Sequence, residues 1–194
     1  MSALEAGCVI SPVRRRLTCG DVRRTSQNRV SGTSQVSTRF RGDELQVVTF
    51  GREARSVGID ELVGLDGAWE QGTNLHHGLL LAARHFRRHP HTQPVLLVVT
   101  DGEPTAHLEP DGTAVFDYPP TDLTLALTVR ELDAIRRLGA RVTFFRLGDD
   151  PGLARFVEAM ARRVDGRVVA PDLDDLGAAV VDSYLTGRRP DTLL

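Results

Sequence analysis

An unbroken apolar run, Val95–Val99, constrains the fold of this chain more than any other stretch of its sequence. It follows Pro94 and ends abruptly in Thr100-Asp101-Gly102, and short bounded runs of this kind are typical of strands buried on both faces. Such strands occur almost only in parallel sheets that helices cover on either side, and ligands bind beyond their carboxyl ends. The run therefore predicts a doubly wound α/β sheet with Asp101 at its ligand-binding edge. A simple Asp-Gly turn is the alternative interpretation of Asp101.

Strand-like and helix-like segments alternate along most of the chain, which predicts right-handed crossovers and a mostly parallel sheet. Further strands are expected at residues 43–50, 54–59, 140–147 and 167–169. Helices are expected to begin at Thr73 or Asn74, at Asp122, at Asp150-Pro151 and at Pro171-Asp172. The strand at 43–50 is expected to carry Leu45 and Val47 on the same face. The helix from Asp122 is expected to turn Leu125, Ala126, Val129, Leu132 and Ile135 inward. Residues 103–121 contain several prolines and are interpreted as a long loop, which in compact domains often carries function.

Composition limits the classes of function that the chain can serve. Its 194 residues suffice for one domain with a two-sided core. A net charge of -2 gives no electrostatic footprint for nucleic acid or for a membrane surface. No apolar run reaches the roughly 20 residues of a membrane-spanning helix. The only cysteines, Cys8 and Cys19, provide no disulfide framework, and a cytoplasmic location is expected.

The beginning of the chain differs in character from the rest. Residues 11–38 are dominated by Arg, Ser, Thr, Gln and Gly and show no sustained period of two or of 3.6 residues. Residues 1–36 are therefore expected to form a disordered leader, or a non-native leader produced by a misassigned start. A basic arm that binds nucleic acid is the alternative. The folded domain is expected to span residues 37–188, and residues 189–194 are a tail.

Two separated motifs lie at the ends of expected elements. Gln71-Gly72-Thr73-Asn74-Leu75 opens a helix, and Val98-Val99-Thr100-Asp101-Gly102 closes the next strand. In this order the pair resembles the von Willebrand factor A (VWA) domain, from about Val36 to Arg188. The resemblance is closest to intracellular bacterial VWA proteins, including those similar to chelatase subunits that work with AAA-type ATPases. It implies a Rossmann-like doubly wound sheet and a role in protein–protein interaction.

The resemblance also implies a metal-ion-dependent adhesion site (MIDAS) at the carboxyl edge of the sheet. In the family this site takes ligands from an Asp-x-Ser-x-Ser loop, a Thr of a second loop and an Asp of a third. Carried over to this sequence, Thr73 and Asp101 match the last two and are the candidate metal ligands. Hydroxyl and carboxylate oxygens suit Mg²⁺. A carboxylate of a protein partner often completes the family's site, and an AAA-type ATPase is the implied partner.

The first part of that motif set is missing. No Asp-x-Ser-x-Ser occurs before Thr73, and although residues 31–34 (Ser-Gly-Thr-Ser) resemble its hydroxyl half, Arg29 stands where the acid would be. We therefore expect a remnant MIDAS that binds Mg²⁺ weakly or not at all. If further oxygens complete the shell, the first candidates are Glu103, Asp117 and Asp66.

The strand that would carry the motif is not evident either. In the family this first strand is central in the sheet, which here places it between residues 44–50 and 95–100. Only the short patch Cys8–Ile10 could replace it. The N-terminal strand is therefore expected to be missing, which would leave unpaired backbone groups on its two neighbours.

Two classes of function remain. The first is a binding module without enzymatic activity, with Phe116 and Tyr118 expected near Asp101 as anchors for a partner. A structural role, in which both rings cover the sheet edge, is the alternative for this aromatic pair. The second class is a metal-dependent hydrolase or phosphatase that uses Asp101 with His76, His77 or His107.

The binding module is favoured, because the sequence lacks the usual signatures of a catalytic site. It shows no paired acid and base at fixed spacing, no nucleophile motif and no phosphate-binding glycine loop. His85, His89 and His91 could suggest zinc ligands, but without a cysteine or carboxylate partner they are interpreted as a solvated helix end.

Overall fold

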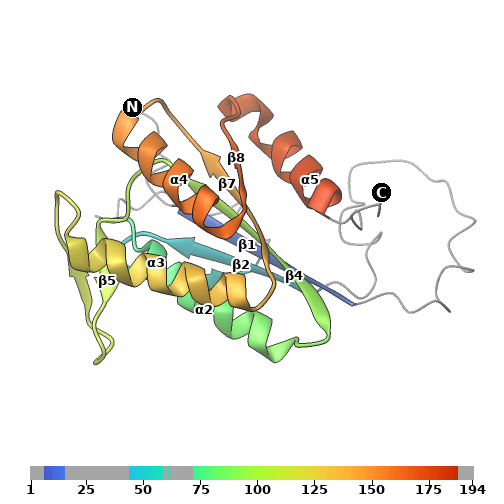
Figure 1. Cartoon of the computed structure of the whole chain (residues 1–194), viewed down its shortest axis with the longest axis horizontal. Coiled ribbons are helices and arrows are strands. Elements are labelled where there is room, and N and C mark those ends of the chain that lie inside the picture. Colours follow the sequence, from blue (N-terminus) through green and yellow to red (C-terminus); the bar gives the residue numbers. More distant parts are fainter. Residues whose placement is uncertain (1–6, 16–43, 59–60, 62–71, 188–194) are drawn as a thin grey trace, which may run out of the picture.

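The computed structural model describes residues 7–15, 44–58, 61 and 72–187, which form a six-stranded sheet with helices on both faces (Figure 1). The sheet contains β1 Gly7–Arg15, β2 Glu44–Phe50, β3 Ala54–Val57, β4 Thr92–Thr100, β7 Arg141–Arg146 and β8 Arg167–Val169. A separate hairpin pairs β5 Ala106–Leu108 with β6 Ala114–Phe116. The helices are α2 Leu75–Arg88, α3 Asp122–Arg137, α4 Pro151–Val164 and α5 Leu176–Gly187, the last preceded by the 3₁₀ turn η2 Leu173–Asp175.

The strand order is β3-β2-β1-β4-β7-β8. Strands β4, β7 and β8 are parallel neighbours, and β2 runs in the same direction because β2 and β4 both pair antiparallel with β1. Edge strand β3 lies within the strand expected at residues 54–59 and runs antiparallel to β2. The prediction of a doubly wound α/β sheet with a mostly common strand direction is confirmed.

Strand β1 fills the central position that the sequence pattern left empty. It pairs with β2 on one side, where Cys8 lies opposite Thr49, and with β4 on the other, where Cys8 lies opposite Val99. The expectation of a missing strand is therefore wrong for the described residues, and Gly7–Arg15 are not a disordered leader. The apolar patch Cys8–Ile10 was too short to predict a strand of nine residues. The strand is longer than the patch because its backbone pairs with two strands that are remote in sequence. The remainder of the leader and the tail at 189–194 lie outside the described residues.

Two layers of apolar side chains cover the two faces of the sheet. On one face α2, α3 and α4 pack over Val48 and Phe50 of β2, Leu96 of β4 and Phe144 of β7. On the other face α5 packs over Val95, Leu97 and Val99 of β4, Phe145 of β7, and Leu147, which directly follows β7. The run Val95–Val99 is buried on both faces, as its composition predicted.

Burial along β2 and α3 follows the apolar pattern of the sequence only in part. Leu45 is 47% exposed, because β2 turns Val48 and Phe50 toward α2 while α5 covers β4 and β7 on the opposite face. In α3, Leu125 is half-buried and packs against the core as expected, but Ala126 is exposed and Val129 is only half-buried. Thr124, Thr128 and Glu131 are buried instead, alongside the expected Leu132 and Ile135. Polar partners explain part of this change, since the Thr124 hydroxyl lies 2.8 Å from Nδ1 of the buried His107.

Residues 103–121 are not a structureless loop. Ala106 lies opposite Phe116 and Leu108 opposite Ala114 in the β5–β6 hairpin, whose turn includes Gly112 at φ +88°. Strands of three residues are too short for a recognisable period. No helix in the described part of the chain is both long and apolar enough to cross a membrane.

Candidate functional site

The loops that carry Thr73 and Asp101 touch at the carboxyl edge of the sheet. Thr73 precedes α2 and Asp101 follows β4. A methyl group on Gly102, the residue after Asp101, would lie only 3.3 Å from the Thr73 hydroxyl oxygen. The structure therefore brings together the two loops that the motifs indicated.

Backbone contacts with the hairpin hold Thr73 in place. Its N–H donates to the Thr105 hydroxyl at 2.9 Å, and its carbonyl accepts from the N–H groups of Thr105 at 3.2 Å and Ala106 at 3.4 Å. Thr105 is 8% exposed, so these bonds are shielded from water. The Thr73 side chain is thus presented by a backbone that is fixed on both sides of its Cα.

Asn74, one of the two expected N-cap residues of α2, is fully buried and forms the cap. Its side-chain oxygen accepts from the His77 N–H at 2.9 Å, and its amide nitrogen donates to the Arg52 carbonyl at 2.8 Å. Its own N–H donates to the Gly51 carbonyl at 2.7 Å. The cap therefore ties the start of α2 to the turn between β2 and β3, and this turn becomes part of the same edge.

The loop after β4 is held by the buried Thr100. Its hydroxyl donates to the Gly102 carbonyl at 2.9 Å, and its carbonyl accepts from the Leu147 N–H at 2.9 Å. Thr100 is 1% exposed, whereas Asp101 and Gly102 are half-buried. Thr100 thus acts as a structural residue that turns the chain and leaves Asp101 at the edge.

Two carboxylates lie close together where α4 begins. A methyl group on Gly152 would be 3.0 Å from both Glu103 Oε1 and Asp150 Oδ1. Asp150 is the N-cap of α4, and this same oxygen accepts from the Leu153 N–H at 2.7 Å. Carboxylates are favoured at a helix N-terminus because the aligned peptide dipoles leave partial positive charge there. Glu103 therefore lies against the α4 terminus, and the sequence signal for Asp150 was its position before Pro151.

Phe116 and Tyr118 extend from the end of the hairpin. Phe116 is 37% exposed, and its ring packs against Gly72, where a methyl group would be 2.8 Å from Phe116 Cδ2. Tyr118 is 81% exposed. Between them, the Asp117 N–H donates to the Thr105 carbonyl at 2.9 Å and fixes the strand end beside Thr73. One aromatic residue thus anchors the hairpin in part, and the other is presented to solvent.

Comparison with known proteins identifies the family. A model of the family described as Rv0959-like protein, vWA domain, matches residues 24–185, which is most of the chain. The chain belongs to this VWA family. Two relatives are the uncharacterized protein Rv0959 of Mycobacterium tuberculosis (strain H37Rv) and Mb0984 of Mycobacterium bovis, each 66% identical over 158 residues. The match covers 79% of this chain but only 24% of each relative, so the chain spans about a quarter of their length. No solved structure matches.

The described residues of this VWA domain do not fit a tight magnesium site. Thr73 and Asp101 contribute one hydroxyl and one carboxylate, and no cluster of three acidic, histidine or cysteine side chains suited to a metal occurs in the described ranges. Mg²⁺ needs near-octahedral oxygen ligands and is usually held by one or two carboxylates together with several waters. Of the expected additional ligands, Glu103 lies against α4, Asp117 lies beside the hairpin, and Asp66 falls outside the described residues.

The histidines that a hydrolase would use serve other contacts in the VWA domain. His76 and His107 are 2% and 1% exposed, and burial lowers the pKa of His76 to about 4. Nδ1 of His76 accepts from the Leu108 N–H at 3.1 Å. Nδ1 of His77 accepts from the Ala54 N–H at 3.0 Å. These imidazoles connect α2 to the hairpin and to β3. The end of α2 is less solvated than expected at His85, whose Nε2 is buried without a partner among the described residues, and His89 Nδ1 lies 2.9 Å from the His85 carbonyl oxygen.

Proposed function

We propose that this VWA domain is a protein-interaction module that binds its partner through the carboxyl edge of the sheet. The observation that carries the proposal is the exposure of two aromatic side chains at the end of β6. Phe116 is 37% exposed and Tyr118 is 81% exposed. Exposed aromatic residues on a rigid scaffold are effective anchors, because each buries a large area with little loss of rotamer freedom. The hairpin hydrogen bonds to Thr73 supply that rigidity.

The proposed partner is an AAA-type ATPase that contributes a carboxylate to the edge. This part of the proposal rests on the resemblance to VWA proteins of the chelatase-subunit type. Thr73 and Asp101 form the remnant of the metal site, and the aromatic pair supplies most of the recognition in place of a fully ligated Mg²⁺. Docking at this edge also agrees with the general rule that loops present recognition residues on α/β sheets.

Site-specific photo-crosslinking tests the proposal. A photoreactive p-benzoylphenylalanine at position 118 should label an AAA-type ATPase in cells, identified by mass spectrometry of the adduct. The matched control is the same residue at position 138, since Leu138 is 36% exposed and lies at the C-terminal end of α3, at the opposite edge of the sheet. Identical products at both positions, or no ATPase adduct at position 118, would contradict the proposal.

A further inference from the structure

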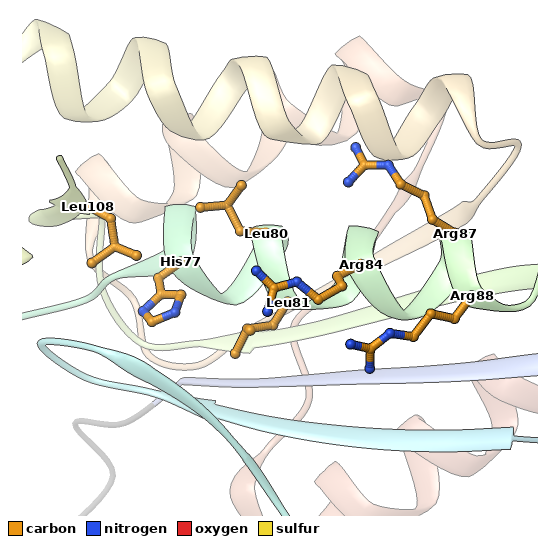
Figure 2. A pocket seen from close by; sticks show the side chains of 7 residues that line it. All are labelled: His77, Leu80, Leu81, Arg84, Arg87, Arg88 and Leu108. Carbon is orange, nitrogen blue, oxygen red and sulfur yellow. The ribbon is translucent and has the colours of Figure 1, made fainter. Parts of the chain in front are cut away.

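A groove runs along the outward side of α2 and ends at the β5 strand of the hairpin (Figure 2). It encloses a volume of about 360 Å³. Apolar and positively charged side chains line it together: His77, Leu80, Leu81, Arg84, Arg87, Arg88 and Leu108. The groove lies outside the Thr73–Asp101 edge but shares the hairpin with it, through Leu108.

The leucines of the groove are not needed to fill the core. The buried face of α2 is formed by other residues, which are Leu75, Leu79, Ala82, Ala83 and Phe86. Leu80, Leu81 and Leu108 are each half-buried, and Leu81 reaches the core only at its margin. A half-buried leucine in a hollow still exposes apolar area, whose removal from water is worth about 25 cal/mol per Å². The groove therefore offers an apolar floor to an occupant that brings apolar side chains.

The rim of the groove carries three guanidinium groups. Arg84, Arg87 and Arg88 are exposed, and no carboxylate of the described residues forms an ion pair with any of them. Four arginines of α3, β7 and α4 do have such partners: Arg130, Arg146, Arg162 and Arg163. Arginine stays protonated in proteins, so the rim holds three fixed positive charges.

The side chains are arranged along the helix rather than around one point. Figure 2 shows Arg84 and Arg88 extending along the same side of α2 as His77 and Leu81, whereas Leu80 and Arg87 lie on the other side. From His77 to Arg88 the helix rises about 16 Å, which is about three turns. A partner helix of roughly ten residues or more matches this length. A small anion would contact only part of the groove.

We propose that the groove binds an acidic amphipathic helix of a protein partner. Its apolar face packs on Leu80, Leu81 and Leu108, and its flanking carboxylates pair with the arginines of the rim. The inference extends the proposed function, because it assigns a second contact and a chemistry to the partner. Helix-in-groove recognition of this kind uses apolar anchors spaced three and four residues apart. Bidentate pairing of guanidinium with carboxylate adds orientation to the contact.

Fluorescence anisotropy with a designed probe tests this assignment on the whole chain. The probe is a capped, labelled helical peptide of about 14 residues, with leucines at i, i+3, i+4 and i+7 and glutamates flanking them. The control peptide has glutamine in place of every glutamate. We expect the acidic peptide to bind at least tenfold more tightly than the control peptide, with an affinity that falls as salt concentration rises.

Paired charge variants locate the contact. The double variant Arg84→Gln and Arg88→Gln should weaken binding of the acidic peptide at least tenfold. The matched control, Arg155→Gln and Arg167→Gln, removes the same charge from two exposed positions on α4 and β8 and should leave the affinity unchanged. Coinciding thermal melts of the wild-type chain and the two double variants would show that a change in affinity does not come from a loss of stability. Equal weakening in both double variants would instead indicate a general charge effect and overturn the proposal.

Three other outcomes would also overturn it. Equal affinity for both peptides would remove the role of the carboxylates, and displacement of the peptide by millimolar inorganic phosphate would point to a simple anion site. Absence of binding by either peptide would mean that the groove is not open to a partner. Retained binding of the acidic peptide, together with no ATPase adduct from the photoreactive residue at position 118, would support the groove while contradicting only the proposed function.

Discussion

His76 Nδ1 accepts a hydrogen bond from the Leu108 backbone N–H at 3.1 Å, and this bond joins the first turn of α2 to the β5 strand. Because Nδ1 is the acceptor, the proton of the neutral ring lies on Nε2, which is buried and finds no partner among the described residues. Protonation of Nδ1 would place two donors face to face. The attachment of the hairpin to α2 therefore depends on a neutral imidazole.

The protein should lose stability on mild acidification through His76. Burial lowers the pKa of His76 from 6.5 to about 4, with Arg130, His107 and His77 acting in the same direction against Glu131. The unfolded chain therefore binds the proton first, and the stabilisation is complete above pH 6.5 and declines as the pH falls toward 4. The decline is up to about 3 kcal/mol in the free energy of unfolding. Urea denaturation at pH 7.5 and 5.0 should measure about 2 kcal/mol of this decline, because pH 5.0 still lies above the folded-state pKa of about 4.

Two substitutions separate the hydrogen bond from the titration. His76→Asn keeps an acceptor close to the Nδ1 position but cannot be protonated in this range, so its stability should depend less on pH than that of the wild-type chain. His76→Leu removes the acceptor and should lower stability by about 1–3 kcal/mol at pH 7.5, because the Leu108 N–H stays buried and unpaired. A wild-type pH dependence retained in His76→Asn would assign the effect to other groups.

Gly72→Ala should destabilise the carboxyl edge. Gly72 has φ +109°, a region that alanine rarely adopts, and the added methyl group would meet Phe116 Cδ2 at 2.8 Å. Backbone strain of this kind costs about 1–3 kcal/mol. Gly112→Ala is the control, since Gly112 also has a positive φ of +88° but has open space around its Cα. The loss of unfolding free energy should be larger for Gly72→Ala, and part of it should return when Phe116→Ala is added.

Removal of the aromatic pair should affect binding more than folding. The double variant Phe116→Ala and Tyr118→Ala should lose at least tenfold in affinity for the partner identified by crosslinking, because exposed aromatic anchors dominate interface energetics. Tyr118 is 81% exposed and contributes little to the folded core, so most of any loss in stability should come from Phe116 against Gly72. Titration calorimetry and a thermal melt measure the two effects. A melt that collapses while affinity is retained would establish the structural role.

Magnesium should bind weakly or not at all near neutral pH. One hydroxyl at Thr73 and one carboxylate at Asp101 leave most of an octahedral shell to water. Calorimetric titration with MgCl₂ should therefore show no saturable heat at submillimolar concentrations, and Asp101→Ala should give the same trace. Tight binding that disappears in Asp101→Ala would refute this prediction and would also reopen the metal-dependent hydrolase, which a phosphatase assay with Mg²⁺ or Mn²⁺ could then examine.

Local sequence signals predicted the parts of the fold that depend on neighbouring residues. The buried run Val95–Val99, the Asn74 cap and the Asp150-Pro151 helix start are each encoded within a few positions, and the structure has all three. The contact between the Thr73 and Gly102 loops follows from the same signals, because α2 leads into the amino end of β4 and therefore begins at the edge where β4 ends. The roles of Thr73 and Asp101 as metal ligands stay predictions.

Features that depend on distant partners could not be predicted in this way. Thr124 and Glu131 are polar, yet α3 buries both on the side that meets His107 and α2. The direction of β1 is likewise set by its pairing with β2 and β4, and a patch of three apolar residues does not encode it. Sequence periodicity reports burial against an apolar neighbour, so it fails where the neighbour is polar or where the strand is short.

The central place of β1 has a consequence for how the chain folds. Strands β2 and β3 are joined by a short turn, and β4 reaches β7 through a single crossover, but β1 must meet Thr49 and Val99 at once. Contacts between residues so far apart in sequence form slowly, because closing long loops costs entropy before the contacts return any stability. Cys8 and its β4 partner Val99 are 91 residues apart (99 − 8), whereas Val95 and its β7 partner Arg141 are 46 apart (141 − 95), so the pairing of β1 with β4 should be the slowest to form. We therefore expect changes in Gly7–Arg15 to alter the rate of folding as well as the final stability.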